Sequence, residues 1–250
     1  MTKHYGILHA DFRELLDSLP THSVHMALFD PPYGKTARNG WDKIVPPGEL
    51  WPRLHRVCKP NAAIVVTAME PFASLLIASD LTNFRYDWIW AKNKSTNFLN
   101  AKKMPLRRHE HVLVFSRKPC RYFPQKTTGH NPVNSFTKHT SDGTNYGHTQ
   151  RGVSGGGQTD RYPTTLLFFP VVNNDDPARS HPTQKPVSLF QYLIETYTRR
   201  NEVVLDPFVG SGTTAVACLQ SGRRFIAGDS NRIYVANARK RVSISLVKPK

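Results

Sequence analysis

The sequence predicts an α/β fold whose sheet is built from both ends of the chain. Short apolar runs alternate with segments of helical periodicity over residues 1–116 and again after residue 186, which is typical of βα units around a parallel sheet. The 250 residues suffice for one large domain with an insertion, and such a chain buries roughly 70–75% of its surface. Residues 117–160 are instead rich in Gly, Thr, Asn, His and Gln, which predicts an interruption of that domain.

The first half of the chain shows the alternation clearly. Residues 24–29 form a largely apolar run, which predicts a buried strand, and the periodic segments between such runs predict helices. The expected elements are strand Tyr5–Leu8, helix Phe12–Leu19, strand Val24–Phe29, helix Pro47–Cys58, strand Ala62–Thr67, helix Pro71–Ser79, and strands Tyr86–Trp90 and His111–Phe115.

The α/β pattern returns near the C-terminus. The expected elements there are helix Pro186–Thr198, strand Glu202–Leu205, helix Thr213–Gln220, strand Arg224–Ala227 and helix Ile233–Val242. We therefore expect one domain made of residues 1–91 and 181–250. The region 92–180 is then an inserted recognition region, with a long loop at about 117–160 that is either functional or disordered.

Charge and cysteine content narrow the function classes. Lys and Arg number 34 against 18 Asp and Glu, and the formal net charge of +16 attracts polyanions such as nucleic acid. A ribosomal or membrane-surface partner, or an ordinary basic protein, would show the same balance. Cys58, Cys120 and Cys218 make neither a metal-ligand pattern nor a disulfide framework, which indicates a reducing cytoplasm. No signal segment and no apolar run of ~20 residues is seen, so a soluble protein without a membrane partner is expected.

Two segments carry the chemistry. Residues 203–214, Val-Val-Leu-Asp-Pro-Phe-Val-Gly-Ser-Gly-Thr-Thr, read as a strand, a tight glycine turn and a helix start that favours an anionic ligand group. Asp229 ends the next strand, near the roughly 20-residue spacing that places an acid on ribose hydroxyls. A structural turn, and an N-cap role for Asp229, are the alternatives. The second segment is Asp30-Pro31-Pro32-Tyr33, a turn stiffened by two prolines after a buried strand, for which a purely structural turn is again the alternative.

These segments resemble motifs of the amino-methyltransferases of DNA, which form N6-methyladenine or N4-methylcytosine. Residues 30–33 match their catalytic motif, residues 206–214 their cofactor motif, and His-Pro-Thr-Gln-Lys-Pro at 181–186 the segment that precedes the cofactor motif in one subgroup. The motif order is that of the β subgroup. The resemblance covers residues 1–116 and 179–242 and is poor across 117–178.

The resemblance implies a Rossmann-like, seven-stranded, mostly parallel sheet in permuted order with helices on both faces. It implies S-adenosyl-L-methionine as cofactor and double-stranded DNA as substrate, and a homodimer is common in the subgroup. Asp11 would read the cofactor's adenine, with an N-cap as its alternative role, and Asp229 stands where the family usually has the longer Glu. The residues assigned to the cofactor are Asp11, Thr183, Lys185, Asp206, Phe208, Gly210, Ser211, Gly212, Thr213, Thr214 and Asp229.

The catalytic residues Asp30, Pro31, Pro32 and Tyr33 suit methylation of a base amino group. Such a nitrogen shares its lone pair with the ring and is a poor nucleophile. If Asp30 and the Pro31 carbonyl each accept one amino hydrogen, the lone pair is freed for attack, and preorganised acceptors stabilise the developing charge. Tyr33 offers a face on which a flipped base can stack.

A basic stretch interleaved with aromatic residues predicts DNA contact. Its basic residues are Lys92, Lys94, Lys102, Lys103, Arg107 and Arg108. The alternative is a solvated strand edge with Trp88 and Trp90 in the core. His109-Glu110-His111 could place two imidazoles on one face, but no third ligand is evident, so no metal is expected.

The sequence thus predicts a site-specific DNA methyltransferase acting in the cytoplasm of a bacterium or of a phage-infected cell, in the chemistry of restriction-modification. Asp rather than Ser at position 30 favours the N6 amine of a flipped adenine. N4-cytosine methylation is the first alternative. RNA methylation and an inactive DNA-binding homologue are the others.

Overall fold

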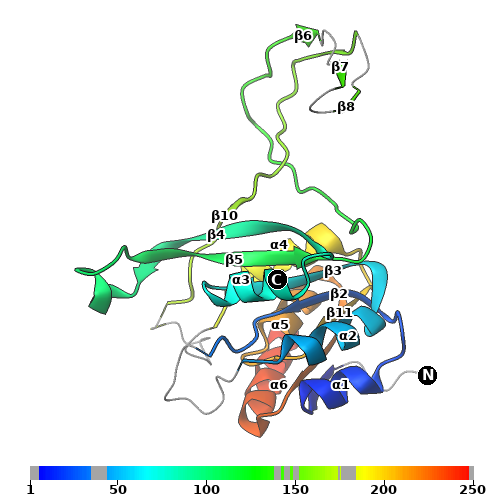
Figure 1. Cartoon of the computed structure of the whole chain (residues 1–250), viewed down its shortest axis with the longest axis vertical. Helices are drawn as coiled ribbons and strands as arrows, with labels where there is room; N and C mark the ends of the chain where they lie inside the picture. Colours follow the sequence, from blue (N-terminus) through cyan, green and yellow to red (C-terminus); the bar gives the residue numbers. More distant parts are fainter. Residues whose placement is uncertain are drawn as a thin grey trace. The chain divides into compact units, whose positions relative to one another are not determined.

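The structure is a computed structural model that describes residues 6–34, 44–137, 142–143, 147–148, 152–173, 175 and 184–247. The chain divides into two compact units, one made of Met1–Phe123 with Thr165–Lys250 and the other of Pro124–Thr164. The first unit is the α/β domain, and the chain leaves it and returns to it once (Figure 1). Residues 92–123, expected in the inserted region, belong to this first unit.

The sheet of the first unit has eight strands in the order β1-β12-β11-β2-β3-β5-β4-β10. Their bounds are β1 Gly6–His9, β2 Val24–Phe29, β3 Cys58–Ala68, β4 Phe84–Thr96, β5 Arg107–Phe115, β10 Leu166–Phe168, β11 Val203–Asp206 and β12 Arg224–Asp229. Neighbouring strands pair in parallel except at β5, which is antiparallel to both β3 and β4. The mostly parallel α/β sheet is confirmed. It holds one strand more than the seven expected, because the short strand β10 adds beside β4.

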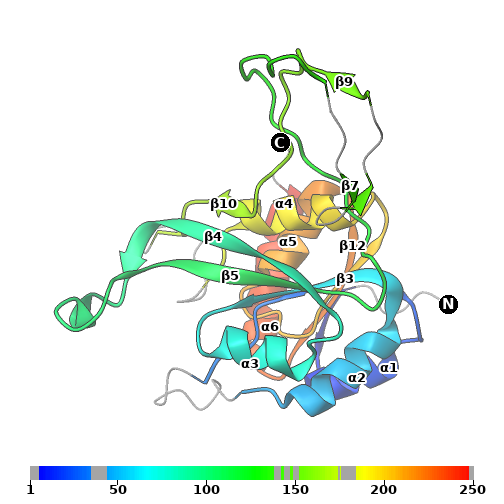
Figure 2. The same cartoon turned by 45° about the horizontal axis from the view of Figure 1, so that its top comes forward.

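Six α-helices of the described residues cover the sheet. They are α1 Phe12–Ser18, α2 Pro47–Val57, α3 Phe72–Ser79, α4 Val187–Tyr197, α5 Thr213–Ser221 and α6 Arg232–Val247. Figure 2 shows α1, α2 and α3 on one side of the sheet and α4 and α5 on the other. Helix α6 packs against α5, the edge strand β1 and its neighbour β12. Both apolar faces of the sheet are therefore buried, as a parallel sheet requires.

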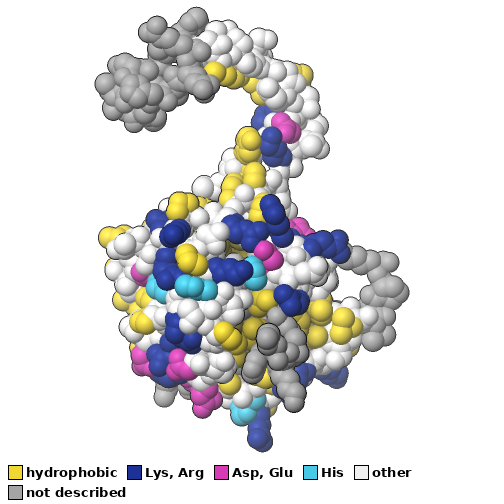
Figure 3. Space-filling view, turned by 90° about the vertical axis from the view of Figure 1, so that its right-hand side faces the viewer, with side chains coloured by type: hydrophobic (Ala, Val, Ile, Leu, Met, Phe, Trp, Pro, Cys, Tyr) yellow, Lys and Arg dark blue, Asp and Glu magenta, His cyan; other side chains and the backbone are white. Residues whose placement is uncertain are grey.

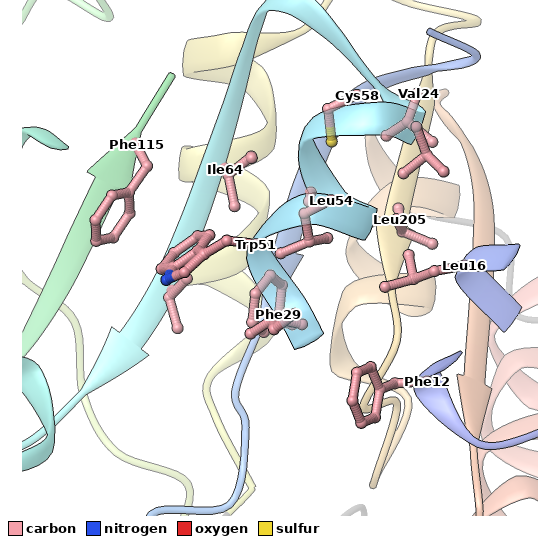
Figure 4. Close-up of a cluster of buried hydrophobic side chains, with 14 of the residues drawn as sticks. Phe12, Leu16, Val24, Phe29, Trp51, Leu54, Cys58, Ile64, Phe115 and Leu205 are labelled. Atoms are coloured by element: carbon pink, nitrogen blue, oxygen red, sulfur yellow. The ribbon is translucent and has the colours of Figure 1, made fainter. Parts of the chain in front are cut away.

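The core beneath α1 and α2 shows why these segments fold as they do (Figure 4). Phe12 and Leu16 of α1 and Trp51 and Leu54 of α2 turn their side chains toward the sheet, each at most 5% exposed. Removing such side chains from water stabilises the fold by roughly 1.5–3 kcal/mol each. This packing holds the strands, and therefore their ends, in a rigid arrangement.

The carboxyl ends of neighbouring parallel strands carry the acidic residues of the motifs. Asp30 follows β2, Asp206 ends β11 and Asp229 ends β12. Since these strands are parallel and adjacent, all three side chains emerge at the same edge of the sheet. Ligands of open α/β sheets bind at this edge, where the strand order reverses.

The second unit, Pro124–Thr164, covers most of the long loop expected at about 117–160 and contains short strands. Two-residue strands pair in antiparallel fashion, β6 Phe136–Thr137 with β9 Ser154–Gly155 and β7 Asp142–Gly143 with β8 Gly147–His148. An ion pair joins Lys126 Nζ to Asp160 Oδ2 at 2.7 Å. Among the described helices of the whole chain, none is both long and apolar enough to cross a bilayer.

Candidate active site

Asp30 lies immediately after β2, and three side chains direct donors at its carboxylate. Thr67 Oγ1, at the end of β3, donates to Asp30 Oδ1 at 2.5 Å, and the Tyr33 hydroxyl donates to the same oxygen. Lys185 Nζ lies 2.7 Å from Asp30 Oδ2. The two prolines between Asp30 and Tyr33 limit the backbone of the turn, which brings the phenol back onto the carboxylate.

Tyr33 is held as a neutral hydrogen-bond donor. Burial, and then the charges of Asp30 and Glu110, raise the pKa of the Tyr33 phenol well above its usual value. Its ring packs on Phe72, with the ring centroids 5.3 Å apart, and the residue as a whole is half-buried. The contact with Phe72 and the hydrogen bond to Asp30 hold the ring at both ends.

Next to Asp30 lies a row of buried side chains with alternating charges, formed by Lys185, Glu110 and Lys92. We call these three residues the buried row. Lys185 Nζ is 3.3 Å from Glu110 Oε2, and Lys92 Nζ donates to Glu110 Oε1. Burial opposes ionisation, but Asp30 and Glu110 raise the pKa of Lys185. Burial likewise opposes the ionisation of Glu110, but Lys185 and Lys92 lower its pKa. Lys185 and Glu110 are therefore both charged near neutral pH.

The structure contradicts the role that the sequence predicted for Lys92. It was expected to contact DNA, but its residue is only 8% exposed and its ammonium is paired with Glu110. Strand β4 turns this side chain inward, so it belongs to the buried row instead of a DNA-facing surface. Trp88 and Trp90 are 3% and 2% exposed, which supports the alternative reading of core tryptophans.

The glycine turn between β11 and α5 takes up left-handed backbone at two positions. Gly210 has φ 45° and Gly212 has φ 78°, values that disfavour any residue with a Cβ. A Cβ on Gly212 would also lie 3.0 Å from Ala238 Cβ of α6, whereas one on Gly210 would have only Phe208 O nearby, at 3.8 Å. Gly212 therefore serves close packing, and Gly210 leaves open space at the turn.

Two carboxylates shape this turn. Asp229 Oδ2 accepts from Gly210 N at 3.0 Å and its Oδ1 accepts from Asn231 N at 2.9 Å. Asn231 Oδ1, at 2.9 Å from Ile233 N, caps α6, so the N-cap role considered for Asp229 falls to Asn231. Asp206 Oδ1 accepts from Phe208 N at 3.0 Å. Burial, with Asp229 and Asp30 adding to it, raises the pKa of Asp206 to about 7.

The hydroxyl of Thr213 connects the glycine turn to Lys185, the lysine that pairs with Asp30. Thr213 Oγ1 donates to Lys185 O at 3.2 Å and accepts from Arg241 at 3.1 Å. Arg241 also donates to Ser211 O at 2.9 Å, and Thr214 Oγ1 donates to Leu28 O at 3.4 Å. Arg241 was not singled out from the sequence, since one arginine in a basic terminal helix carries no signal of its own.

Two of the remaining cofactor candidates, Asp11 and Phe208, follow the carboxyl ends of β1 and β11 and so lie near the same edge of the sheet. Asp11 caps α1 in a capping box with Glu14, which supports its structural alternative. The Phe208 ring lies between Phe12 and Phe29, with centroid distances of 5.6 and 5.5 Å. Thr183 lies outside the described residues.

The other basic candidates surround an exposed hairpin tip between β4 and β5. Lys102, Lys103 and Arg108 are exposed, Arg107 is half-buried, and Lys94 is exposed with its ammonium 2.7 Å from Asn173 Oδ1. In the 3₁₀ turn Phe98–Asn100 at this tip, Phe98 and Leu99 are 74% and 84% exposed. Among the residues that the structure describes, no group of three or more His, Cys, Asp or Glu side chains is placed to hold a metal ion.

Comparisons with known proteins agree with this geometry. A family model described as DNA methylase, N6_N4_Mtase, matches residues 24–240. The Type II methyltransferase M2.LlaDCHI of Lactococcus lactis subsp. cremoris is 29% identical over 273 residues, which covers 97% of this chain and 93% of that protein. The match spans both the Asp30 segment and the glycine turn.

Solved structures share the fold. The M1.HpyAVI–SAM complex is 23% identical with a TM-score of 0.62, covering 95% of this chain and 98% of that one. The PvuII DNA methyltransferase, named as cytosine-N4-specific, is 17% identical with a TM-score of 0.66, covering 96% of this chain and 87% of that one. At these identities the likeness establishes the fold.

Proposed function

Because the chain belongs to the DNA methylase family N6_N4_Mtase, we propose that it transfers a methyl group from S-adenosylmethionine to the exocyclic N6 amine of a flipped adenine in double-stranded DNA. One observation carries the proposal. Lys185 connects Asp30 to the glycine turn, since its Nζ lies 2.7 Å from Asp30 Oδ2 and its carbonyl accepts from Thr213 Oγ1 at 3.2 Å. An acceptor of amino hydrogens and a cofactor turn therefore adjoin one another.

The donor set of the turn fits the cofactor. S-adenosylmethionine, the methyl donor of this family, supplies when bound a methyl group made electrophilic by its sulfonium sulfur. The cofactor's ammonium and sulfonium charges suit an edge where Asp229 and Asp30 lie close enough to raise the pKa of Asp206. The open space at Gly210 admits the ligand to the backbone N–H groups at the start of α5.

Asp30 and its neighbours would act on the substrate by position and charge. The Asp30 carboxylate and the Pro31 carbonyl accept the two amino hydrogens, which frees the nitrogen lone pair for in-line attack. Thr67 and Tyr33 keep the carboxylate in one orientation through their bonds to Oδ1. Because these groups are preorganised, little reorganisation opposes the charge that develops on nitrogen.

Adenine is favoured over cytosine by the residue at position 30. Asp, in place of the Ser that many N4-cytosine members of the resembled family carry, favours the N6 amine. N4-cytosine methylation is the second candidate, because the PvuII enzyme named for that reaction shares this fold. Both reactions use the same chemistry at Asp30.

Nucleoside mass spectrometry tests the proposal directly. Purified protein and S-adenosylmethionine are incubated with unmethylated plasmid DNA, which is then digested to nucleosides. N6-methyladenine is the expected product. N4-methylcytosine would preserve the mechanism and contradict the choice of base. No methylated base in DNA, at high enzyme concentration and on several plasmids, would contradict DNA methylation, and the same assay on RNA would then test that alternative.

The substitution Asp30→Ala tests the proposed role of Asp30 as acceptor of an amino hydrogen. We expect turnover to fall below detection, because the amino hydrogens lose their charged acceptor, while the dissociation constants for cofactor and DNA change by less than about threefold. Equilibrium binding and single-turnover methylation measure the two effects. Substantial remaining methylation would contradict the role of Asp30 and would favour a structural turn.

The partners follow from the proposed substrate. DNA is expected to meet the exposed basic residues of the β4–β5 hairpin, and residues 92–180 remain the proposed recognition region. Work on DNA in a bacterial or phage-infected cell would place the protein in the cytoplasm, and the Type II name of its relative is consistent with restriction-modification. A homodimer is proposed from the family resemblance, and light scattering of the purified protein measures its molar mass.

A further inference from the structure

Both oxygens of the Asp30 carboxylate already face donors of the protein itself. Thr67 and Tyr33 both donate to Oδ1, and the Lys185 ammonium lies 2.7 Å from Oδ2. A target amino group that donates to Oδ2 therefore shares this oxygen with the Lys185 cation. A cation held at this carboxylate also opposes the positive charge that the amino nitrogen gains during methyl transfer.

Glu110 offers the Lys185 ammonium a second position. Its Oε2 lies 3.3 Å from Lys185 Nζ, yet this oxygen is buried and makes no hydrogen bond in the structure. A buried acceptor without a hydrogen bond is costly and rare in folded proteins. A small rotation at the end of the lysine side chain would satisfy it without moving the backbone.

Lys92 keeps the other end of Glu110 in place. Its ammonium donates to Glu110 Oε1 and lies 5.0 Å from the centroid of the buried Trp90 ring. The side chains of Lys92, Glu110 and Lys185 are only 6–7% exposed. With Asp30, the row holds two positive and two negative groups, so removal of Glu110 alone leaves a net positive charge beside the reacting nitrogen.

We propose that Glu110 is a positioning residue of methyl transfer, which takes over the Lys185 ammonium from Asp30 when the target amine arrives. This frees Asp30 Oδ2 to accept an amino hydrogen and draws positive charge away from the nitrogen. The inference rests on the proposed function, but it holds for adenine and cytosine alike. In the reaction the nitrogen forms one bond to the methyl carbon, the electrons of the carbon–sulfur bond stay on sulfur, and the nitrogen then releases one proton to solvent.

Glu110→Gln tests the proposal, since the amide keeps the size of the side chain and removes its charge. We expect the single-turnover rate at saturating substrates to fall roughly 100-fold, a loss of the size seen when one charge-stabilising group is removed from an active site. Dissociation constants for S-adenosylmethionine and for DNA should change by less than about threefold. Asp87→Asn is the matched control, because it removes one negative charge from the neighbouring strand β4, where Asp87 pairs with His111.

A second substitution separates charge from packing. In E110Q/K92M the buried row together with Asp30 is again neutral, and we expect the rate to recover roughly tenfold over E110Q. A purely structural role for Glu110 predicts no recovery, since K92M removes a further packed side chain. Should E110Q not fold, the double variant lacks the unpaired buried cation and is compared directly with wild type, with a reduced rate expected at unchanged cofactor affinity.

The outcomes distinguish this inference from the function on which it rests. A wild-type protein that methylates no base amine would contradict the proposed function and the inference with it. An active wild type with an E110Q rate within about threefold of its own would overturn the inference alone. A slow E110Q variant that K92M does not accelerate would also overturn it.

Discussion

At the scale of single residues, the site places two aspartates in opposite surroundings at the ends of neighbouring strands. Asp30 receives a lysine ammonium at one carboxylate oxygen and two hydroxyl groups at the other. Asp206 is 3% exposed, and its pKa is raised by burial and by the nearby carboxylates Asp229 and Asp30. The two carboxylates therefore differ in their surroundings: Asp30 is ion-paired and hydrogen-bonded, whereas Asp206 is buried near two further carboxylates.

The raised pKa of Asp206 predicts a stability that depends on pH. Burial, together with Asp229 and Asp30, raises this pKa from 3.8 to about 7. Between these values the folded protein keeps a proton that the unfolded chain has lost, so the Asp206 contribution to stability falls as the pH rises toward 7. We expect Asp206→Asn to gain roughly 2 kcal/mol relative to wild type on going from pH 5 to pH 7.

Denaturant unfolding of both proteins at several pH values measures this difference. The amide can still accept from Phe208 N, so the turn itself should persist. If the difference in unfolding free energy between the two proteins were the same at pH 5 and pH 7, Asp206 would not be protonated in the folded state.

At the scale of elements, the glycine turn at the start of α5 and the β4–β5 hairpin differ in how closely they are packed. The turn packs so closely on α6 that Gly212 has no room for a side chain, while Gly210 borders open space. The hairpin instead extends to a tip where Phe98 and Leu99 are exposed among basic residues. Packing inside the protein constrains the glycine turn, whereas the hairpin tip is exposed to solvent.

The two glycines give a matched pair of substitutions. Gly212→Ala combines a left-handed φ of 78° with a Cβ 3.0 Å from Ala238 Cβ, so we expect it to lower the unfolding free energy by about 2–3 kcal/mol. Gly210→Ala carries backbone strain alone and should cost about 1 kcal/mol. Its Cβ points into the space assigned to the cofactor, so G210A should weaken S-adenosylmethionine binding more than its stability loss implies.

Thermal unfolding and calorimetric titration with S-adenosylmethionine separate these effects. Equal losses of stability in the two variants would contradict the close packing of Gly212 on α6. Unchanged cofactor affinity in G210A would show that the ligand does not approach the turn at that position.

Because the β4–β5 hairpin carries exposed lysines, we predict that it makes a salt-dependent contribution to DNA binding. Removing the charges of Lys102 and Lys103 at the exposed tip should weaken binding roughly tenfold at low salt and reduce the slope of log K against log salt by up to about 2. Lys240→Ala, on the exposed part of α6, is the control for general loss of charge and should bind like wild type. A slope that stays the same after the K102A/K103A substitution would remove this hairpin from the DNA interface.

At the scale of the whole molecule, an α/β unit holds the candidate active site, and a separate small unit interrupts it in the sequence. Every residue placed at the candidate active site belongs to the first unit. On the face shown in Figure 3, Lys and Arg side chains outnumber Asp and Glu, in keeping with the net charge of +16. A polyanion is thus attracted broadly, and specificity must come from particular elements.

Removal of the second unit tests this division. When Pro124–Thr164 is replaced by a flexible Gly-Ser linker of about 10 residues, we expect the first unit to fold and to bind S-adenosylmethionine with wild-type affinity. Methylation of specific DNA should be lost or spread over other sites, because the proposed recognition region is shortened. Circular dichroism, calorimetry and sequencing-based mapping of methylated sites measure the three properties. Wild-type site preference in the shortened protein would contradict a recognition role for this unit.

Local sequence patterns were sufficient for most of the first unit. Strand β2 begins and ends where the apolar run does, and the other expected helices and strands of the sheet domain recur with shifted ends. Such patterns are readable because side chains alternate with period 2 in strands and 3.6 in helices. Strand β10 was missed, since only Leu167 of its three residues is buried and its pairing depends on β4.

The sequence by itself identified the Asp30 turn and the glycine turn as the candidate sites, because prolines and glycines constrain the backbone locally. Only the tertiary structure decided what surrounds Asp30. Lys185 is 155 positions away from it along the chain, and Lys92 pairs with Glu110 across 18 positions that include the β4–β5 hairpin. A lysine in a sequence looks the same whether it will lie in solvent or beside a buried carboxylate. The difference arises only when the strands pair, because burial and ion pairing depend on residues that the fold brings together from distant parts of the chain.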